Sequence, residues 1–462
     1  MAGVGLAMNR QELRNVSHRK GEAMPASISV IGTGYLGATH AACMAELGHD
    51  VIAYDVDATK IAALADGVLP FFEPGLDDLL REHTASGRLR FTTSIEELAE
   101  RADVHFICVG TPQRPDGLAA DTSYVEAAVR ALVPHLTRPS LVVGKSTVPV
   151  GTAARLQQLA QRWADPGVNV EVAWNPEFLR EGHAVSDTLR PDRVVLGVSS
   201  PEAEKILRFV YDAFLVEDVP VLVTDLATAE LVKSAANAFL ATKITFANAM
   251  AELCDVTGAD VVTLADALGY DRRIGRSFLG AGIGFGGGCL PKDIRALMAS
   301  ALELGADDLF ALLGAVDMTN LRRRDAVVEA AASMCGGTLG GARIACLGAS
   351  FKPGTDDVRD SPALDIAAKL QRLGADPVVY DPQANENGAQ AFPELTFVGS
   401  VDEAVRGAEL VMLLTEWPEL VALDPRALCD GVGSPRVLDG RNALNPDHWR
   451  AAGWTYRALG RP

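Results

Sequence analysis

Short apolar, β-branched runs alternate with helix-like segments along the first half of the chain. From Ser27 onward, strands are predicted at ISVIG, DVIAYD, RLRFTT, DVHFICVG, LVVGKST and VEVAW, and RVVLGV and VPVLVTD continue the pattern to about Asp225. Amphipathic helical patterns lie between most of these runs. Such alternation predicts a doubly wound α/β domain with a parallel sheet.

The pattern then becomes purely helical. From Leu226 to about Gly258 the sequence has the pattern of one long, Ala-rich helix, and a second helix is predicted to end at Gly269. A glycine-rich loop follows, and further helices are expected from about Asp293 to Met334. This segment is predicted to connect two α/β halves and to pack subunits together.

A second α/β region follows GGTLGG, with strands predicted at ARIACLGASF, DPVVYDP, LTFVG, ELVMLLTEW and RVLDGRN. It indicates an architectural duplication of the first half without a sequence repeat. The expected organisation is a disordered tail (1–26), a first α/β domain (27–226), a helical central and dimerisation domain (227–336) and a C-terminal α/β domain (337–462). Met24, directly before the first strand, is a candidate start of the native protein.

Composition narrows the class of protein. A chain of 462 residues is too long for one ordinary core, and the apolar fraction of 48% is typical of a globular protein. Its apolar runs are too short to span a membrane. The net charge of −18 argues against general binding to nucleic acid or acidic membranes, although a local cluster of Arg and Lys can still hold an anionic substrate.

The seven cysteines have no paired or CxxC spacing, which argues against a disulfide framework and for a reducing compartment, the cytoplasm. Cys289 differs from the rest because it ends the loop GIGFGGGCLPKD, with Lys292 and Asp293 opening the next predicted helix. A thiol near a helix N-terminus and a lysine ionises more readily, so Cys289 is a candidate nucleophile; a buried cysteine closing a turn is the alternative. The others are expected to be small core residues: Cys43, Cys108, Cys254, Cys335, Cys346 and Cys429.

GTGYLG follows the first predicted strand directly and precedes a helical segment. In a dinucleotide-binding turn, Gly32 permits the tight bend, Gly34 lets backbone approach a pyrophosphate, and Gly37 allows close helix–strand packing. Asp55 ends the second strand, where an acid accepts ribose hydroxyl groups and favours NAD over NADP. A glycine turn in an unrelated α/β domain is the alternative.

Three later strands also end in polar residues. Thr111 in VGTP follows the fourth strand and Thr147 in STVP follows the fifth, where ligands bind in open α/β sheets; a helix N-cap is the alternative role for either. NPEFLREG places Glu177 and Glu181 after the sixth strand, as acid–base groups or as solvated loop carboxylates.

Lys233 and Asn237 lie four residues apart on the long predicted helix and therefore share a face. The surrounding ELVKSAANAF is largely apolar, which favours a pair facing a pocket over ordinary surface polarity. Both side chains are candidate site residues.

The motifs GTGYLG, VGTP, KSTVPVGT, NPEFLREG, ELVKSAANAF, GFGGGCLPKD, FKPGTDDVRDSP and DGRN, in this order over nearly the whole chain after Met24, closely resemble the UDP-glucose 6-dehydrogenase family. The resemblance implies two Rossmann-like doubly wound domains joined by a helical domain with a long helix, with NAD as cofactor, no metal and at least a homodimer. It also implies oxidation of a nucleotide sugar from CH₂OH to carboxylate in two hydride transfers, through a thiohemiacetal and a thioester.

The same resemblance implies a role for each site residue. Catalysis falls to Cys289 as nucleophile, Lys233 as stabiliser of negative charge on oxygen, Glu177 as acid–base residue with Thr147, and Asn237 and Asp293 as groups that hold intermediates and position water. The implied cofactor contacts are Gly32, Gly34, Tyr35, Leu36, Gly37, Asp55, Lys60, Thr111, Thr147, Glu181, Lys292 and Arg359. The implied substrate contacts are Glu177, Phe178, Leu179, Arg180, Lys233, Asn237, Arg273 (often across a subunit interface), Phe285, Gly286, Lys352 and Arg441.

The sequence departs from the family pattern at Gly288, where serine is frequent, at Leu290, where phenylalanine is frequent, and at His183, where small residues are common. UDP-glucose is the favoured substrate because TLRPDRVV follows PEFLREG, and GDP-mannose with the same mechanism is the alternative. A single-step β-hydroxyacid dehydrogenase would not explain Cys289 or the third domain, and an inactive nucleotide-sugar binder would lack the thiol. The usual role of the product is to supply uronate for polysaccharides.

Overall fold

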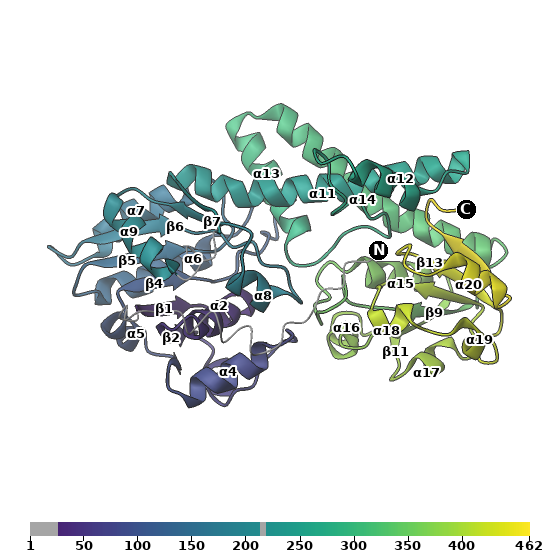
Figure 1. The fold of residues 1–462 in the computed structure, drawn as a ribbon, viewed down its shortest axis with the longest axis horizontal. Helices are drawn as coiled ribbons and strands as arrows, with labels where there is room; N and C mark the ends of the chain where they lie inside the picture. The colour runs from purple at the N-terminus through teal and green to yellow at the C-terminus, as the bar shows by residue number, and fades with distance from the viewer. Residues whose placement is uncertain (1–25, 213–218) are drawn as a thin grey trace. The chain divides into compact units, whose positions relative to one another are not determined.

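The computed structural model describes residues 26–212 and 219–462 (Figure 1). The tail expected over residues 1–26 therefore lies outside the described residues, apart from Ala26. Within the described ranges, no helix is both long enough and apolar enough to cross a membrane.

The chain divides into two compact units. The first consists of the chain up to Pro112 together with Ala120–Lys233, and the second of Gln113–Ala119 together with Ser234–Pro462. Each unit contains one β-sheet with its own hydrophobic core.

The sheet of the first unit has the strand order β3-β2-β1-β4-β5-β6-β7-β8. Its strands are β1 (Ser27–Ile31), β2 (Asp50–Tyr54), β3 (Leu89–Thr92), β4 (Val104–Ile107), β5 (Ser140–Gly144), β6 (Val170–Trp174), β7 (Val194–Gly197) and β8 (Val221–Thr224). The helices between them include α2 (Tyr35–Glu46), α3 (Ala58–Ala65), α4 (Leu76–Ala85), α5 (Ile95–Arg101), α6 (Ser123–Leu132), α7 (Thr152–Trp163), α8 (Ala184–Leu189) and α9 (Pro201–Val210). This arrangement confirms the predicted doubly wound sheet.

Side chains of β1 show why its sequence is apolar throughout. Ile28 and Val30 pack in one core with α2, α4, α8 and α9, whereas Ile31 packs in the other core with α5, α6 and α7. Successive side chains of a strand point to opposite faces, so a strand covered on both faces is apolar at consecutive positions. The polar exception, Ser29, is buried with its hydroxyl group hydrogen-bonded to Nδ1 of His105 at 2.7 Å.

One part of this sheet departs from the all-parallel prediction. β7 pairs with β6 in antiparallel orientation through the residues Trp174 and Gly197, and β8 then runs parallel to β7. A Cβ at Gly197 would lie 2.5 Å from the Cβ of Ala229, so a side chain would not fit at this crossing. The last two strands therefore run opposite to the others, a reversal that the apolar pattern of a strand does not reveal.

The second sheet has the order β11-β10-β9-β12-β13-β14, and all its neighbouring strands are parallel. Its strands are β9 (Arg343–Leu347), β10 (Asp376–Tyr380), β11 (Thr396–Phe397), β12 (Leu410–Leu413), β13 (Arg436–Asp439) and β14 (Thr455–Ala458). The accompanying helices are α15 (Pro362–Arg372), α16 (Asn385–Ala391), α17 (Val401–Val405), α18 (Pro418–Val421), α19 (Pro425–Leu428) and α20 (Pro446–Ala451). The strand β14 was not predicted, because its four residues alternate between exposed and buried and form too short a pattern.

The order of the second sheet matches that of β3-β2-β1-β4-β5-β6, which is the order of a Rossmann fold. This match confirms the expected architectural duplication. In the first domain the strand β2 is followed by Asp55, and at the equivalent place after β10 stands Asp381. Asp381 is fully buried and accepts hydrogen bonds from the backbone N–H groups of Ala349 (2.7 Å) and Ser350 (2.9 Å) and from the indole of Trp417 (3.1 Å). The second acid thus supports the domain internally.

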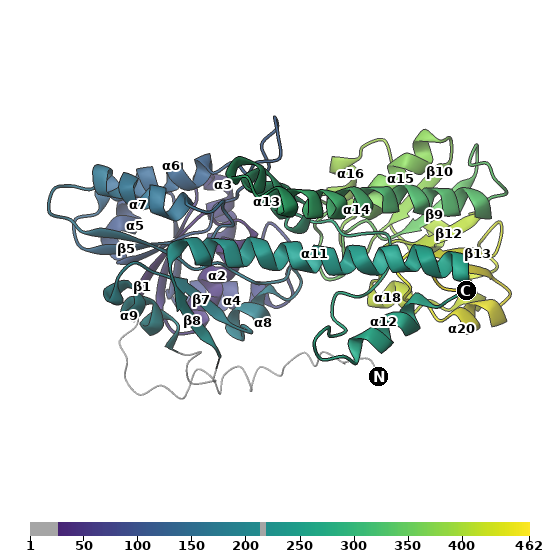
Figure 2. The same cartoon turned by 90° about the horizontal axis from the view of Figure 1, so that it is seen from above.

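Four helices lie between the two sheets in the sequence: α11 (Leu226–Thr257), α12 (Val261–Gly269), α13 (Leu290–Leu304) and α14 (Asp307–Met334). Figure 2 shows α11 as one unbroken helix, which confirms the predicted long helix. Small side chains at Ala238 and Ala241 let α11 pack closely against Ile294 of α13 and Val316 of α14 in a common core.

Replacement of Asp381 by alanine is expected to lower the free energy of unfolding by about 3 kcal/mol, because several buried N–H donors lose their acceptor. Asp376→Ala, at the exposed start of β10, removes only a surface ion pair with Arg343. This substitution is expected to change the free energy of unfolding by less than about 1 kcal/mol. Urea titration monitored by circular dichroism measures both values. Equal effects of the two substitutions would contradict the structural role of Asp381.

Candidate active site

The glycine turn after β1 has the geometry that its sequence predicts. Gly32 has a φ angle of +91°, and a Cβ at Gly37 would lie 1.7 Å from the carbonyl oxygen of Gly32. Around Gly34, in contrast, no atom lies within 4 Å of the place that a Cβ would occupy. Gly32 and Gly37 close the turn against the helix, and Gly34 leaves open space at the N-terminus of α2, where the helix favours an anion such as a pyrophosphate.

The carboxylate of Asp55 lies beside this turn. It accepts hydrogen bonds from the backbone N–H and the hydroxyl group of Thr33 at 2.9 and 3.0 Å, and from the N–H of Asp57 at 3.1 Å. Burial alone would raise the pKa of Asp55, but these hydrogen bonds and the ammonium group of Lys60, 3.1 Å away, lower it overall. The resulting anion can accept ribose hydroxyl groups and would repel a 2′-phosphate, so these residues fit NAD.

Thr111 and Thr147 join the loops that follow β4 and β5. The hydroxyl group of Thr111 donates a hydrogen bond to the carbonyl oxygen of Thr147 at 2.8 Å. The N-cap of α6 is Thr122 and that of α7 is Gly151, so the alternative role of either threonine as a helix N-cap is wrong. Both residues remain at the carboxyl edge of the sheet.

A buried carboxylate that the sequence analysis missed links the glycine turn to the segment after β6. Glu73 accepts hydrogen bonds from the hydroxyl group of Tyr35 and from the backbone N–H groups of Gly182 (2.6 Å) and Ala184 (2.7 Å). Burial raises the pKa of Glu73, and the hydrogen bonds oppose this rise. Glu73 stands in a loop, where no periodic pattern marks a carboxylate as buried.

Glu177 and Lys233 form a buried ion pair. Oε1 of Glu177 lies 2.9 Å from Nζ of Lys233, and the two side chains are only 12% and 7% exposed. The second carboxylate oxygen accepts a hydrogen bond from the N–H of Leu179 at 2.7 Å. This pair places an acid–base group next to a cation, in agreement with the prediction that Lys233 does not face solvent.

The residues after Glu177 have different surroundings. The ring of Phe178 lies 3.7 Å from the guanidinium carbon of Arg193 and 5.7 Å from Nζ of Lys233, measured to the ring centre. Arg180 is largely exposed and forms a two-pronged ion pair with Asp187 at 2.7 and 2.8 Å. The predicted substrate segment therefore presents an aromatic ring and an exposed guanidinium group.

Cys289 differs from the other cysteines in exposure and position. Cys289 alone among the seven cysteines is exposed, and it occupies the N-cap position of α13. Cys43, Cys108, Cys254 and Cys346 are buried, as predicted, whereas Cys335 and Cys429 are half-buried at the edges of their cores. Burial raises the pKa of Cys108 and of Cys346 to about 12, which leaves these thiols unreactive. The alternative of a buried Cys289 closing a turn is wrong.

Asn237 and Asp293 meet in the second unit although 56 positions separate them. The Nδ2 group of Asn237 donates a hydrogen bond to Oδ2 of Asp293 at 2.6 Å, and both side chains are buried. Lys292 forms an ion pair with the other carboxylate oxygen. A carboxylate in the first turn of α13, paired with an amide of α11 and one turn from a thiol, can hold and polarise a water molecule.

The glycine-rich loop before Cys289 closely approaches other parts of its own unit. Asn320 of α14 accepts a hydrogen bond from the N–H of Phe285 and donates one to its carbonyl oxygen, both at 2.9 Å. A Cβ at Gly286 would lie 2.1 Å from the carbonyl oxygen of Asp360, and the N–H of Gly287 donates to the carbonyl oxygen of Arg359 at 2.9 Å. The glycines therefore allow backbone to pack on backbone.

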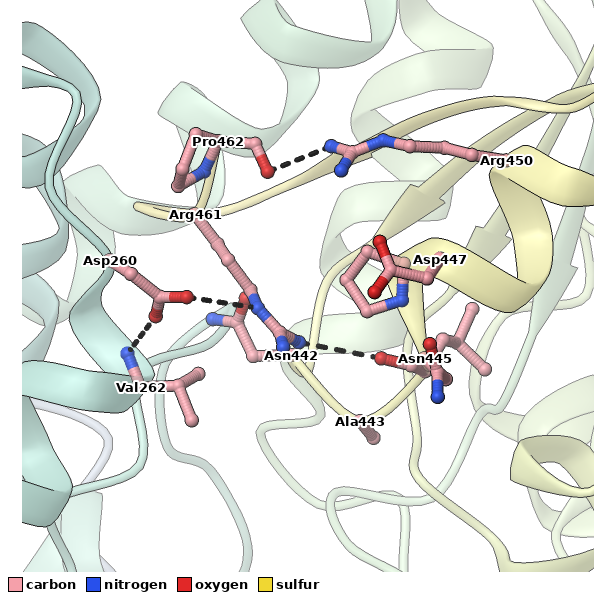
Figure 3. A pocket seen from close by; sticks show the side chains of 11 residues that line it. Asp260, Val262, Asn442, Ala443, Asn445, Asp447, Arg450, Arg461 and Pro462 are labelled. Carbon is pink, nitrogen blue, oxygen red and sulfur yellow. Dashed lines mark hydrogen bonds and ion pairs between the residues drawn. The ribbon is translucent and has the colours of Figure 1, made fainter.

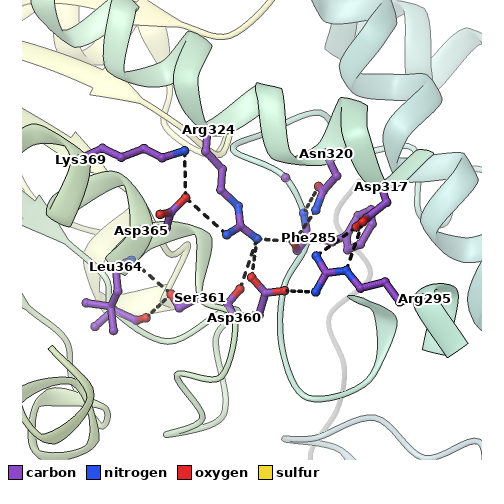
Figure 4. A network of polar contacts seen from close by, with 12 residues as sticks. Phe285, Arg295, Asp317, Asn320, Arg324, Asp360, Ser361, Leu364, Asp365 and Lys369 are labelled. Carbon is purple, nitrogen blue, oxygen red and sulfur yellow. Dashed lines mark hydrogen bonds and ion pairs between the residues drawn. The ribbon is translucent and has the colours of Figure 1, made fainter. Parts of the chain in front are cut away.

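A network of charged residues holds the turn on which this loop rests (Figure 4). The buried guanidinium group of Arg324 donates to Oδ1 of Asp360 at 2.8 Å and lies 3.4 Å from Asp365. Arg295 pairs with Asp317 at 3.1 Å and lies 3.7 Å from Asp360. Asp360 has a φ of +46°, so these ion pairs stabilise a backbone conformation that non-glycine residues rarely adopt.

The departure from the family pattern at Gly288 has a structural counterpart. A Cβ at this position would lie 2.3 Å from the guanidinium carbon of Arg359. The Arg359 side chain is bound in turn to both carboxylate oxygens of Asp357, at 2.9 Å from its Nε. A larger residue at position 288 would displace the guanidinium group of Arg359, and glycine leaves room for this group.

The remaining predicted substrate residues occupy distinct environments. Arg441 donates hydrogen bonds to the carbonyl oxygens of Leu414 (2.6 Å) and Phe351 (3.1 Å), which fix its guanidinium group. Nζ of Lys352 lies 5.7 Å from the centre of the Phe351 ring. The side chain of Arg273 is 89% exposed and forms an ion pair with Asp271 at 2.6 Å.

A cavity of about 610 Å³ near the end of the chain contains none of the predicted site residues (Figure 3). Its charged groups largely bind one another: Arg461 pairs with Asp260 at 3.4 Å, and Arg450 donates to the carbonyl oxygen of Pro462 at 2.7 Å.

The models of three domains of one protein family match successive parts of the chain. The NAD binding domain of the UDP-glucose/GDP-mannose dehydrogenase family matches residues 26–215, its central domain matches 227–322, and its UDP binding domain matches 345–446. The chain belongs to this family. It is an NAD-dependent oxidoreductase, as the sequence analysis predicted.

Relatives match along most of their length. UDP-glucose 6-dehydrogenase TuaD of Bacillus subtilis (strain 168) is 42% identical over 436 residues, which cover 94% of this chain and 93% of that protein. UDP-glucose 6-dehydrogenase of Rhizobium meliloti (strain 1021) is 42% identical over 94% of this chain and 99% of its own. The solved structure of a UDP-glucose dehydrogenase from the archaeon Pyrobaculum islandicum has a TM-score of 0.88 at 40% identity, over 95% of this chain and 98% of that one.

Two glycine substitutions in the cofactor turn are expected to separate folding from NAD binding. Gly37→Ala forces a Cβ onto backbone and should lower the free energy of unfolding by about 2–4 kcal/mol. Gly34→Ala meets only open space, so its stability should stay within about 0.5 kcal/mol of the wild type while NAD affinity falls about tenfold or more. Thermal unfolding and fluorescence titration with NAD measure the two effects. Unchanged NAD affinity in Gly34→Ala would rule out this turn as the pyrophosphate site.

Proposed function

We propose that this enzyme oxidises UDP-glucose to UDP-glucuronate, with two NAD molecules reduced per sugar. The observation that carries the proposal is the exposed thiol of Cys289 at the N-terminus of α13, one turn from the buried Asn237–Asp293 pair. A simple alcohol dehydrogenase needs no such nucleophile. The names of the relatives and the matching UDP binding domain support a uridine nucleotide as the carrier of the sugar.

In the first oxidation, the primary alcohol of the sugar loses a proton and a hydride. Bound NAD supplies the hydride acceptor. The Glu177 carboxylate, with Thr147, takes the proton, and the Lys233 ammonium group stabilises negative charge as it develops on the alcohol oxygen. Because Lys233 is already paired and buried, it loses little water when the substrate binds, and its charge acts in a medium of low dielectric constant.

In the second oxidation, the thiolate of Cys289 adds to the carbon of the aldehyde and forms a thiohemiacetal. Loss of a second hydride and of the hydroxyl proton gives a thioester. Water held by Asn237 and Asp293 then adds to the thioester carbonyl, and the thiolate leaves as the carboxylate forms. The balance is one alcohol, two NAD⁺ and one water giving one carboxylate, two NADH and three protons.

Substrate and cofactor contacts are assigned within this proposal. Residues 27–226 bind NAD, residues 227–336 form the helical domain, and residues 337–462 bind the nucleotide. Lys352 and the fixed guanidinium group of Arg441 contact the substrate from the C-terminal domain. The cysteines, four of which are buried in the hydrophobic cores, support a reducing compartment, the cytoplasm, as the place of action.

The proposed enzyme is a homodimer whose interface includes α11. Phe239, Phe246 and Leu253 follow one another at intervals of seven residues on α11 and are 66%, 48% and 54% exposed. Seven residues make about two helical turns, so these side chains form one apolar stripe that a second copy can cover. In such a dimer the exposed Arg273, held by Asp271 at 2.6 Å, would contact the substrate of the partner subunit.

The stoichiometry of the reaction is the decisive test. Purified protein with NAD and UDP-glucose is expected to form about two NADH per sugar, and Cys289→Ser should fail to complete turnover because no thioester can form. NADH absorbance and chromatographic measurement of the sugar nucleotides give both numbers. One NADH per sugar in the wild type would reject the thioester route. Activity with GDP-mannose alone would keep the mechanism and assign the alternative substrate.

The dimer is tested by a charge in the apolar stripe. Phe246→Glu is expected to shift the protein from dimer to monomer, because a buried unpaired carboxylate at the interface costs several kcal/mol. Light scattering coupled to size-exclusion chromatography measures the mass. Leu373→Glu, at an exposed apolar position of the C-terminal domain, is the control and should remain dimeric. A dimeric Phe246→Glu protein would exclude this stripe as the interface.

A further inference from the structure

Lys145 is a buried lysine to which the proposed reaction assigns no role. It follows β5 directly, two residues before Thr147. Its Nζ atom donates a hydrogen bond to Oδ1 of Asn175 at 2.8 Å and lies 3.4 Å from the hydroxyl group of Tyr211. The rings of Phe106 and Tyr211 lie 5.8 and 5.9 Å from the same atom. The described residues therefore surround this cation with neutral hydrogen-bond partners and aromatic rings.

The hydrogen-bond partner of Lys145 is the side-chain amide of Asn175, whose oxygen and nitrogen atoms both form hydrogen bonds. Oδ1 of Asn175 also accepts a hydrogen bond from Tyr211 at 2.5 Å, and Nδ2 donates to the carbonyl oxygen of Val195 at 2.8 Å. The backbone N–H of Asn175 donates to the carbonyl oxygen of Gly144 at 2.8 Å. Asn175 stands two residues before Glu177, so this cluster anchors the start of the segment that carries the acid–base carboxylate.

Burying a charged group among neutral partners costs desolvation free energy. The presence of a lysine here therefore points to a role for its charge. Burial lowers the pKa of Lys145 to about 8; the charge of Lys233 adds to this effect, whereas Cys108 and Glu177 oppose it. Electrostatic interactions between two groups act in both directions. The charge of Lys145 therefore also acts on Glu177 and on Lys233. Methionine, of similar length, would fill the same space without the cost of desolvation.

We propose that Lys145 is a positioning residue for the oxidation: it holds Asn175, and thereby Glu177, and its positive charge acts on the Glu177–Lys233 pair. The inference rests on the proposed function, because it assigns Glu177 the proton transfer. Lys145 touches neither the substrate nor the cofactor in this assignment. It acts through the geometry and charge of the residues that do.

The groups that face Lys145 define which protons its charge can influence. They are Tyr211 after α9, Cys108 after β4, His40 of α2, and the Glu177–Lys233 pair. Burial holds the pKa of His40 well below its usual range, and the charge of Lys145 adds to this effect. Burial raises the pKa of Tyr211 and of Cys108, so neither changes its charge near neutral pH. The charge of Lys145 is therefore expected to act on the Glu177–Lys233 pair.

The test compares two neutral substitutions. Lys145→Met removes both the hydrogen bond and the charge, whereas Lys145→Gln keeps a hydrogen-bond donor and removes the charge. A nearby positive charge makes proton binding harder, so its loss should move the acid limb of the kcat–pH profile to higher pH by on the order of one unit in both variants. At neutral pH, kcat should fall about tenfold or more in Lys145→Met and less in Lys145→Gln, with KM for UDP-glucose and NAD within about twofold of the wild type.

Tyr211→Phe is the matched control, because it removes a hydroxyl group from the same cluster and leaves the charge in place. Its pH profile should coincide with that of the wild type. Thermal unfolding measured for each variant separates loss of activity from loss of folded protein. If both Lys145 variants keep the wild-type pH profile, or if Lys145→Met fails to fold and Lys145→Gln keeps that profile, Lys145 is a structural residue only.

The outcome for the wild type distinguishes the two proposals. Two NADH per sugar together with unshifted profiles in the Lys145 variants would overturn the role of Lys145 and leave the proposed function intact. A wild-type enzyme that oxidises neither UDP-glucose nor GDP-mannose would overturn both.

Discussion

Parallel strands end at a common edge of their sheet, and this constraint positions the first half of the candidate active site. The strands β1, β2, β4, β5 and β6 bring the glycine turn, Asp55, Thr111, Thr147 and Glu177 to that edge. Sheet hydrogen bonds fix the ends of the strands, and polar contacts between the loops, such as the bond from Thr111 to Thr147, then set their spacing. Reactive groups far apart in the sequence thus share one region without any contact between their own side chains being required.

The second unit positions its chemistry by close packing of backbone. The glycine-rich loop before Cys289 rests on the turn at Asp360, where no side chain could fit at Gly286. Arg324 and Arg295 hold that turn in a left-handed conformation, so the exposed thiol depends on a buried charge network in the C-terminal half of the chain. Substitutions in this network are expected to act on catalysis through the position of the loop.

The buried polar side chains at the candidate active site occur in pairs. Glu177 is paired with Lys233 and Asn237 with Asp293, and α11 carries one member of each pair, four residues apart. An unpaired buried charge would be neutralised or would destabilise the fold, so each reactive group needs a partner. In the same way, the buried Lys145 has a hydrogen-bond partner, Asn175, two residues before Glu177.

The sequence by itself determined most of the elements and the geometry of the glycine turn after β1. Both doubly wound sheets, the long helix and the roles of the glycines after β1 were predictable, because strand and helix periodicity and turn geometry depend on residues close together in the chain. The reversal at β7, the strand β14 and the buried carboxylate of Glu73 were not predictable. Glu73 binds the backbone of Gly182, 109 positions away, and Asn237 finds Asp293 at 56 positions. Only the tertiary structure decides such partners, because sequence spacing specifies which side chains share a face and packing specifies which faces meet.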